Sequence, residues 1–400
     1  MAAVIGRGNL GLGDLTADTP GVLPDRLLDD AITAGWIDAG PGPPPGGLLP
    51  GGGLSGGLVQ PASVDLRVGA RALRIRCSFL PDDETVADKV EAHILDELDL
   101  DGEGAVLETN RPYLIPLVEH LHLPPHVRGR ANPKSSTGRL DVFTRVITDR
   151  SFRFDEVAPG YDGPLYLEVV PLSFPVRVRQ GLALNQLRLM VGRALLSDAE
   201  LVDLHRSQPL LYRAGRPATE REFATADGLF LSLDLRGDAD RRVGYRSRSH
   251  AALLDMSKLG DHRVEDFWEP VRSEDGDRVV LDPESFYLLL SEESVCVPPH
   301  LACEMTAYDP TSGELRTHYA GFFDPGFGYS RDGRLLGSRA ALEVRAHDVP
   351  FMIEHGQRVC KLTFEHMVAE PTRLYGDDVG SNYQGQVETL GKHFRAATRR

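Results

Sequence analysis

The segment NPKSSTGRLDVFTRVITD, residues 132–149, gathers side chains that suit an anion. An arginine can hold two phosphate oxygens at once, a lysine adds a point charge, and hydroxyl groups supply further hydrogen bonds. The spacing is not that of a P-loop, and we expect a strand rather than a helix after the cluster. The residues favour either a phosphate site or an ordinary polar turn. The five members of this anion cluster are Lys134, Ser135, Ser136, Thr137 and Arg139.

Three segments of the first half recur in the same order roughly 170–175 residues later. HLPPHVRGR (122–130) is echoed by CVPPHLACE (296–304), GPLYLEVVPLSFPVRVRQGLALNQLRL (163–189) by SRAALEVRAHDVPFMIEHGQRVCKLTF (338–364), and SVDLRVG (63–69) more weakly by SLDLRGD (232–238). The repeat is too long for a solenoid unit, so it indicates duplication of a whole β-domain. The corresponding stretch of the second copy, Tyr308 to Arg316, lacks the anion cluster. A turn needed only for folding would not require the cluster in one copy, so we interpret it as a function of the first copy.

Glu168 lies in the apolar pattern YLEVV, which predicts a strand. A carboxyl that is partly buried there would have a raised pKa, as a proton shuttle requires. The second copy keeps an acid at the matching position, Glu343, which also favours a shared structural role. Tyr161, between two glycines, either closes over a ligand or packs on its own turn, and Gln186 bonds either the backbone or a ligand. The HxE and PCxxC signature of zinc-dependent deaminases is absent from the sequence, so any deamination would proceed without zinc.

The composition is that of a globular protein, with 400 residues of which 41% are hydrophobic and 26% charged. A net charge of −15 argues against general binding to nucleic acid or membranes. The sequence has no apolar run of membrane-spanning length and no signal-peptide pattern. Its four cysteines form no CxxC pair and are typical of reduced thiols, which predicts a cytoplasmic protein.

Around these residues the chain is mainly β with a few short helices. A helix is expected within PGVLPDRLLDDAITAGWI, followed by a Gly/Pro-rich linker, and a short helix is expected between the two copies. The predicted divisions are residues 1–57 for the N-terminal helix and linker, 58–195 for the first copy, 196–224 for a connector, 225–370 for the degenerate second copy, and 371–400 for a C-terminal tail that the first copy lacks.

The motifs QPASVDLRVG, KSSTGRLDVFTRVITDR, PGYDGPLYLEV and LNQLRL, in that order, resemble the dCTP deaminase branch of the dUTPase-like family. LYGDDVGSNYQGQ is similar to the family's C-terminal segment, which closes over the nucleotide. The chain looks like the long, duplicated form. The resemblance implies two tandem distorted β-barrel (β-clip) domains and active sites between the subunits of a trimer. It also implies metal-free deamination of dCTP to dUTP and ammonia, with Mg²⁺ accompanying only the triphosphate.

The resemblance also assigns roles to residues. Glu168 matches the glutamate that activates water, and Ser135, Ser136 and Arg139 match the active-site motif. Lys134 stands where arginine is usual, and Asn382 where lysine is common. Thr148 stands where alanine is common. The remaining positions that the resemblance places near the base or the phosphates are Thr137, Val146, Thr148, Arg150, Tyr161, Gln186, Tyr375, Tyr383 and Gln386.

Two other functions stay open at this point. Asp149 or Asp155 could activate water at phosphorus, which would make the protein a dUTP diphosphatase or a bifunctional enzyme yielding dUMP. A nucleotide-binding regulator without turnover is the third candidate. We expect a homo-oligomer, with a trimer favoured, and a tail from the second copy that serves the site of the first. The sequence leaves open whether dTTP inhibits the protein.

Overall fold

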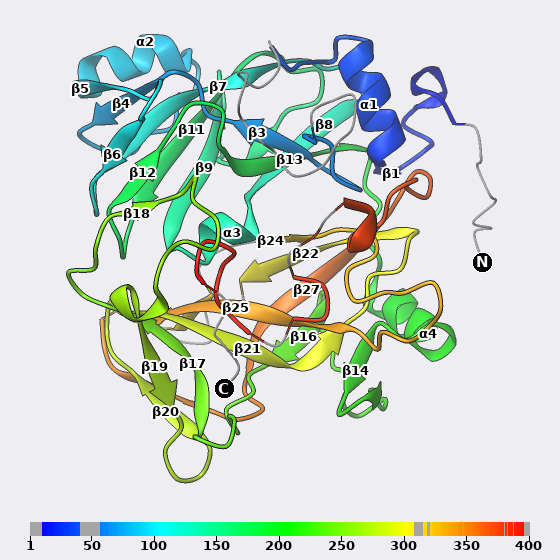
Figure 1. Ribbon diagram of the computed structural model, residues 1–400. Helices are drawn as coiled ribbons and strands as arrows, with labels where there is room; N and C mark the ends of the chain where they lie inside the picture. The colour runs from blue at the N-terminus through cyan, green and yellow to red at the C-terminus, as the bar shows by residue number, and fades with distance from the viewer. Residues whose placement is uncertain are drawn as a thin grey trace.

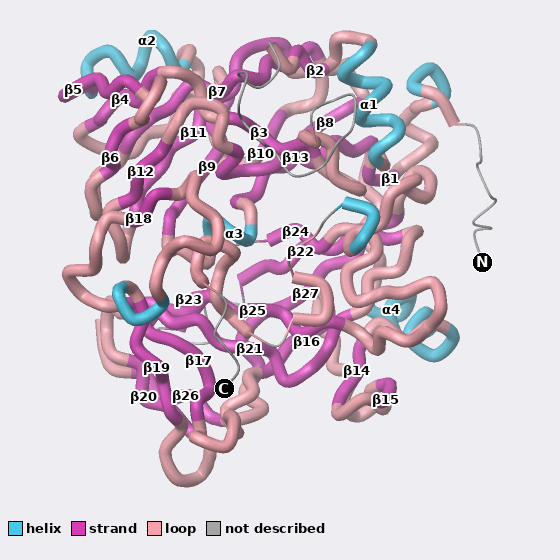
Figure 2. Tube along the Cα trace, in the orientation of Figure 1, coloured by secondary structure: helices cyan, strands magenta, loops and turns pink. Residues whose placement is uncertain are grey.

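The computed structural model describes residues 10–40, 57–307, 315–317, 321–346, 348–379, 381, 383–386 and 388–395. Strands make up most of the ordered structure, and the helices are few and short (Figure 2). The helices are α1 (Asp25–Thr33), α2 (Val86–Val90), α3 (Ser135–Gly138) and α4 (Asp198–Ser207), with 3₁₀ turns η1 (Leu12–Asp14), η2 (Glu91–His93), η3 (Val264–Asp266) and η5 (Asp377–Val379). The expected mainly β class is confirmed. No helix in the described part of the chain is long and apolar enough to cross a membrane.

The first half holds two larger sheets. One has the order β1 (Gly21–Val22), β13 (Ala183–Val191), β8 (Val127–Pro133) and β10 (Glu156–Val157), with β3 (Val64–Arg67) also paired to β13. The other has the order β5 (Ile94–Asp99), β4 (Arg71–Ile75), β7 (Tyr113–His122), β11 (Asp162–Pro171) and β9 (Val142–Thr148), with β2 (Ile37–Asp38) paired to β7.

The second half also holds two larger sheets and a two-stranded sheet. The first sheet has the order β16 (Leu229–Ser232), β27 (Arg358–His366), β22 (Leu301–Ala307) and β24 (Gly321–Phe323). The second has the order β15 (Arg216–Pro217), β14 (Leu211–Arg213), β21 (Phe286–Val295), β17 (Arg242–Ser247) and β19 (Trp268–Arg272), with β25 (Ser338–Ala346) between β21 and β23 (Leu315–Thr317). The two-stranded sheet pairs β20 (Arg278–Leu281) with β26 (Phe351–Glu354).

The strands that carry the sequence repeat pair in the same way in both halves. Strand β11 lies between β7 and β9, and β25 lies between β21 and β23. Strand β8 lies between β13 and β10, and β22 lies between β27 and β24. Glu168 on β11 and Glu343 on β25 therefore occupy corresponding places in two sheets of like pairing.

The two halves are in contact, with the first half above the second in Figure 1 and α3 at their boundary. Strand β18 (Leu254–Asp255) pairs parallel with β12 (Val176–Val178), which also pairs with β6 (Ala105–Leu107). The buried Arg188 donates to Asp324 at 3.0 Å, and Arg345 is paired with the fully buried Asp141. Because breaking a buried ion pair is costly, these contacts oppose movement of one half against the other.

Both predicted helices are present as α1 and α4, and the structure adds α2 and α3. Helix α1 buries Leu27, Leu28 and Ala31, and α4 begins with a capping box in which Ser197 and Glu200 bond each other's backbone. The anion cluster itself forms the single helical turn α3, which the sequence had not indicated, and the expected strand follows it as β9. Most of the Gly/Pro-rich linker, residues 41–56, and much of the segment from Tyr308 to Arg316 lie outside the described residues.

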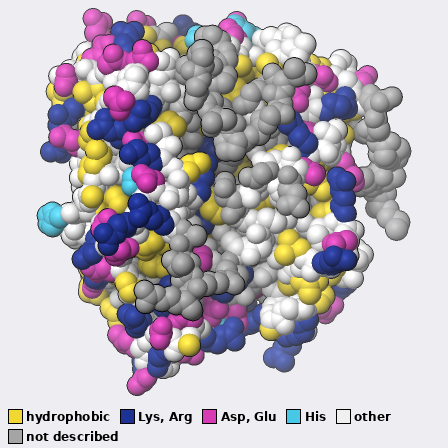
Figure 3. Space-filling model, in the orientation of Figure 1, with side chains coloured by type: hydrophobic (Ala, Val, Ile, Leu, Met, Phe, Trp, Pro, Cys, Tyr) yellow, Lys and Arg dark blue, Asp and Glu magenta, His cyan; other side chains and the backbone are white. Residues whose placement is uncertain are grey.

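The surface carries no single block of positive charge on the face shown in Figure 3, where basic and acidic side chains are interspersed. This pattern agrees with the acidic net charge of −15. In a protein of this acidic charge an anion site needs a local group of cations, and the anion cluster on α3 lies at the boundary between the halves.

Candidate functional site

The anion cluster is built on the turn that joins β8 to β9. Lys134 anchors this turn, since its backbone N–H donates to Leu184 O at 3.0 Å and its carbonyl accepts from Thr137 N at 2.8 Å. Gly138 ends the helical turn. A Cβ atom at Gly138 would lie 2.8 Å from Glu343 Oε2, so glycine allows this turn to approach a strand of the other half closely.

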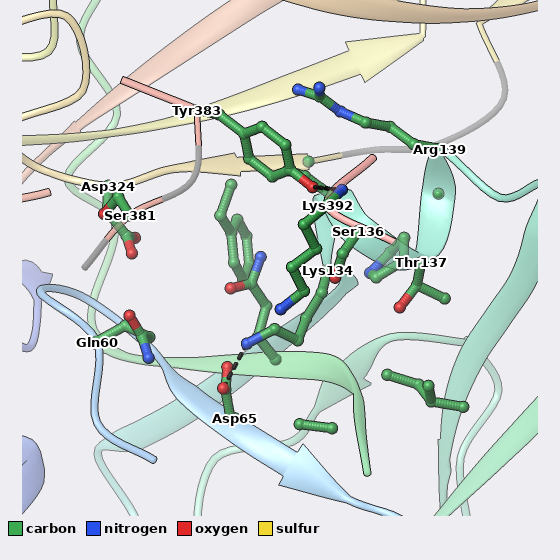
Figure 4. Close-up of a pocket in the computed structure, with 18 of the residues that line it drawn as sticks. Gln60, Asp65, Lys134, Ser136, Thr137, Arg139, Asp324, Ser381, Tyr383 and Lys392 are labelled. Atoms are coloured by element: carbon green, nitrogen blue, oxygen red, sulfur yellow. Dashed lines mark hydrogen bonds and ion pairs between the residues drawn. The ribbon is translucent and has the colours of Figure 1, made fainter. Parts of the chain in front are cut away.

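A cavity of about 280 Å³ lies between the two halves and beside α3. The first half contributes the anion cluster, Asp65 and Gln186; the second contributes Met305, Phe322 and Glu343. The C-terminal segment lines the remaining side (Figure 4). Nine of the predicted site residues meet at this cavity, namely Lys134, Ser135, Ser136, Thr137, Arg139, Gln186, Tyr375, Tyr383 and Gln386. One chain therefore builds this cavity from both of its halves.

Arg139 connects the anion cluster to the tail. Its guanidinium donates to Gln386 Oε1 at 2.8 Å and to Thr389 O at 3.1 Å. It also lies 3.8 Å from the centre of the Tyr383 ring, a cation–π contact. The side chain is only 3% exposed. The tail of the second half thus packs against the cluster of the first half, which agrees with the arrangement expected from the sequence.

Glu343 is the carboxyl of the second half that lies beside Gly138, in the turn that carries the anion cluster. It lies on β25, is buried, and contacts Gly138. Burial raises the pKa of the Glu343 carboxyl to about 8, with the nearby Asp141 adding to the rise and Arg139 opposing it. The sequence had pointed to Glu343 only as the structural counterpart of Glu168. The repeat was the signal that could have identified it.

Glu168 does not line the cavity. It is fully buried on β11, and Arg145 on the neighbouring strand β9 donates to its Oε1 at 2.6 and 3.2 Å. The Arg145 guanidinium is also held over the Phe154 ring at 3.7 Å and donates to Ser78 Oγ at 2.8 Å. The structure therefore places Glu168 in an ion pair of the first half, apart from Ser135 and Arg139.

Four predicted binding residues also lie away from the cavity. The backbone of Val146 is occupied by Asp155: the Val146 N–H donates to Asp155 Oδ1 at 2.8 Å, and the Val146 carbonyl accepts from the Asp155 N–H at 2.9 Å. Tyr161 packs on its own turn and donates to Pro164 O at 2.6 Å. Thr148 is buried in β9, and Arg150 is an exposed turn residue with φ of 53°.

The two acids considered for attack on phosphorus are likewise elsewhere. Burial raises the pKa of Asp155 to about 7, but Asp155 and Asp149 do not line the cavity. Asp149 accepts from Val86 N at 2.8 Å. Asn382, the position where a lysine is common in the family, lies outside the described residues.

Several cavity residues had not been predicted. Asp65 on β3 is paired with Lys134, and Lys392 from the tail extends toward the same space (Figure 4). Their roles depend on contacts between distant segments, which the local sequence does not show. Within the described ranges, no group of three or more His, Cys, Asp or Glu side chains is arranged to hold a metal ion.

The fold and the cavity define a mainly β protein whose two halves have the same strand pairing, with a pocket between them that both polar and apolar side chains line. A family model described as the 2'-deoxycytidine 5'-triphosphate deaminase (DCD) N-terminal domain matches residues 20–193. The model described as the C-terminal domain of the same deaminase matches residues 197–394. The chain belongs to the 2'-deoxycytidine 5'-triphosphate deaminase family.

Individual proteins agree with this membership. The chain is 44% identical to the 2'-deoxycytidine 5'-triphosphate deaminase of Agrobacterium tumefaciens in its crystal structure, with a TM-score of 0.78 over 88% of this chain and 99% of that one. It is 32% identical over 131 residues to the dCTP deaminase of Halorubrum lacusprofundi and 31% identical over 130 residues to the dCTP deaminase, dUMP-forming, of Halobacterium salinarum. Each match covers 32% of this chain and 62% of the archaeal protein.

Proposed function

We propose that this protein hydrolyses the amino group of dCTP and releases dUTP and ammonia, without a catalytic metal. The observation that carries the proposal is the position of Glu343. This buried carboxyl, with a pKa raised to about 8, lies against α3 in the same cavity as Ser135, Ser136 and Arg139. Membership of the deaminase family supports the choice of reaction.

The chemistry needs a group that both takes and gives a proton. Water attacks C4 of cytosine and loses a proton, and the amino group gains one before it leaves as ammonia. A carboxyl with a pKa near 8 is protonated in roughly nine of ten molecules at pH 7. In the ionised fraction it takes the proton from water as a base and then, as the acid so formed, gives it to the amino group. We assign this proton shuttle to Glu343 rather than Glu168, because Glu168 is held by Arg145 and lies outside the cavity.

The rest of the cavity suits a nucleotide triphosphate. The anion cluster offers hydroxyls and cations at one side, and Mg²⁺ would arrive with the triphosphate rather than with the reacting water. The tail covers the cluster through Arg139, which would keep bulk water from the base once the ligand is bound.

Product analysis tests this proposal. The purified protein is incubated with dCTP or with dUTP, with and without Mg²⁺, and ammonia, dUTP, dUMP and pyrophosphate are measured. We expect ammonia and dUTP from dCTP, and no change in dUTP. Pyrophosphate would instead support the bifunctional, dUMP-forming reaction named for the Halobacterium salinarum relative. Nucleotide binding without any product would identify a regulator.

We also retain the tandem dUTPase-like barrels, the cytoplasmic location and the homotrimer as proposals. The like strand pairing of the two halves supports the first of these. Light scattering tests the assembly, since a monomeric or dimeric mass would exclude the trimer. Adding dTTP to the deaminase assay would show whether it inhibits.

A further inference from the structure

We propose that Lys392, in the C-terminal segment, binds the polyphosphate end of the nucleotide and makes the site selective for triphosphates. The proposal rests on the proposed function, because it assumes a nucleotide in this cavity. It concerns a residue of the tail beyond the positions that the sequence had indicated.

The backbone around Lys392 is fixed against the second half. Its carbonyl accepts from Gly260 N at 3.0 Å, and the next carbonyl, of His393, accepts from Asp261 N and His262 N, both at 3.1 Å. Phe394 then packs edge-on against Phe267 and Trp268, with ring centres 5.7 and 6.0 Å apart. The segment is therefore held in place by protein contacts, and the Lys392 side chain is directed into the cavity (Figure 4).

The charges at this side of the cavity do not balance. Lys134 and Lys392 point toward the same space, but the carboxylate there, Asp65, is paired with Lys134 (Figure 4). Among the described residues, no acidic side chain lies within ion-pair distance of Lys392. Burial lowers the pKa of Lys392, and repulsion from Lys134 lowers it further, although Asp65 opposes the change. A cation held in this way gains from an anionic ligand, which restores the missing counter-charge.

The position of Glu343 indicates which end of the nucleotide lies at Lys392. Lys134 immediately precedes α3, whereas Glu343 contacts Gly138, the last residue of that turn. Phosphates need cations, which the two lysines supply, whereas a proton shuttle must face the reacting C4 atom of the base. The phosphates therefore belong beside the lysines and the base beside Glu343. Arg139 is already bonded to Gln386 and Thr389, which leaves Lys392 as the cation best placed for additional phosphates.

The test uses the full chain and inorganic tripolyphosphate, which binds without being deaminated. Calorimetric titration compares the wild-type protein with Lys392→Gln, Lys392→Arg and the control Lys258→Gln. Lys258 is an exposed lysine of the adjacent loop, paired with Asp261 and not lining the cavity, so its substitution changes the same charge nearby. The KM for dCTP and the binding of dCMP are measured on the same variants.

Loss of one charge-assisted contact predicts a ~10- to 100-fold weaker affinity of Lys392→Gln for tripolyphosphate and a comparable rise in the KM for dCTP. Binding of dCMP should change less than threefold, Lys392→Arg should retain most of the affinity, and Lys258→Gln should match the wild type. Because the substitution removes a half-buried charge that has no ion-pair partner among the described residues, the melting temperature of Lys392→Gln should not fall.

Three results would overturn the inference. They are wild-type protein that does not bind tripolyphosphate, Lys392→Gln protein that binds it normally, and equal losses for dCMP and tripolyphosphate accompanied by a lower melting temperature. None of these depends on ammonia release. The two proposals can therefore be refuted separately: Lys392 can bind phosphate in a protein that does not deaminate dCTP, and a deaminase can bind phosphate without Lys392.

Discussion

Replacing Glu343 with glutamine should abolish most of the deaminase activity while leaving the fold in place. Glutamine has the same shape, so it can keep the contact with Gly138, but it cannot exchange a proton at neutral pH. Positioned proton transfer contributes typically ~10²- to 10⁴-fold to an enzyme rate, and we expect a loss of kcat in that range. In the wild type, activity that needs the protonated carboxyl should decline as the pH rises above about 8.

The same substitution should change how stability depends on pH. The pKa of Glu343 rises from 4.5 to about 8 in the folded protein, which corresponds to a penalty on the order of 5 kcal/mol for burying the ionised form. When folding raises the pKa of a carboxyl, its contribution to the free energy of unfolding is fully present below the pKa of the unfolded state. This contribution is lost as the pH rises through the pKa of the folded state. Glu343→Gln should therefore match the wild type near pH 4 and be more stable than it at pH 9.

Glu168→Gln is the matched control. It removes the negative charge that pairs with Arg145, so it should lower the free energy of unfolding by roughly 3 kcal/mol. The kcat of the folded protein should stay within about threefold of the wild type. Ammonia release and thermal or urea unfolding are measured on both variants between pH 5 and 9. If Glu168→Gln loses turnover and Glu343→Gln keeps it, the assignment of the proton shuttle is refuted.

Two further substitutions probe the framework of the cavity. Gly138→Ala places a methyl group 2.8 Å from Glu343 Oε2, so the carboxyl must move. We expect kcat, measured by ammonia release, to fall ~10-fold or more, and the free energy of unfolding, measured by thermal unfolding, to fall by about 1–3 kcal/mol. An unchanged kcat would show that this contact does not matter. Asp25→Ala removes the buried carboxylate on α1 that accepts from Thr372 and Arg373 at 2.5–3.1 Å and so anchors the start of the tail. It should raise the KM for dCTP ~10-fold and expose the tail to trypsin, whereas a wild-type KM with a protected tail would show that α1 does not hold the tail.

The sequence was most informative where chemistry depends on neighbouring residues. The crowding of hydroxyls and cations from Lys134 to Arg139 predicted a polar site, and all five residues line the cavity. The helix periodicity around Leu27 and the short helix before the second half were also recognised, because capping and amphipathic spacing are local features.

What the sequence could not provide was the packing of one half on the other. The repeat showed that Glu168 and Glu343 are counterparts, but not which of them faces the anion cluster. Likewise, the pairing of Arg145 with Glu168 depends on the strand register, and the position of Lys392 near Lys134 depends on the path of the tail. Neither can be read from the local sequence. Tyr161 is a further example: the resemblance placed it near the ligand, but the structure shows the other alternative, a tyrosine packed on its own turn.

The most direct test of the central claim is a crystal structure of the Glu343→Gln protein with dCTP. We predict that C4 of the cytosine lies within hydrogen-bonding reach, by way of one water molecule, of the substituted side chain on β25, with the triphosphate beside Ser135, Lys134 and Lys392. A base bound against Glu168 and Arg145, or a nucleotide outside the cavity between the halves, would contradict the assignment.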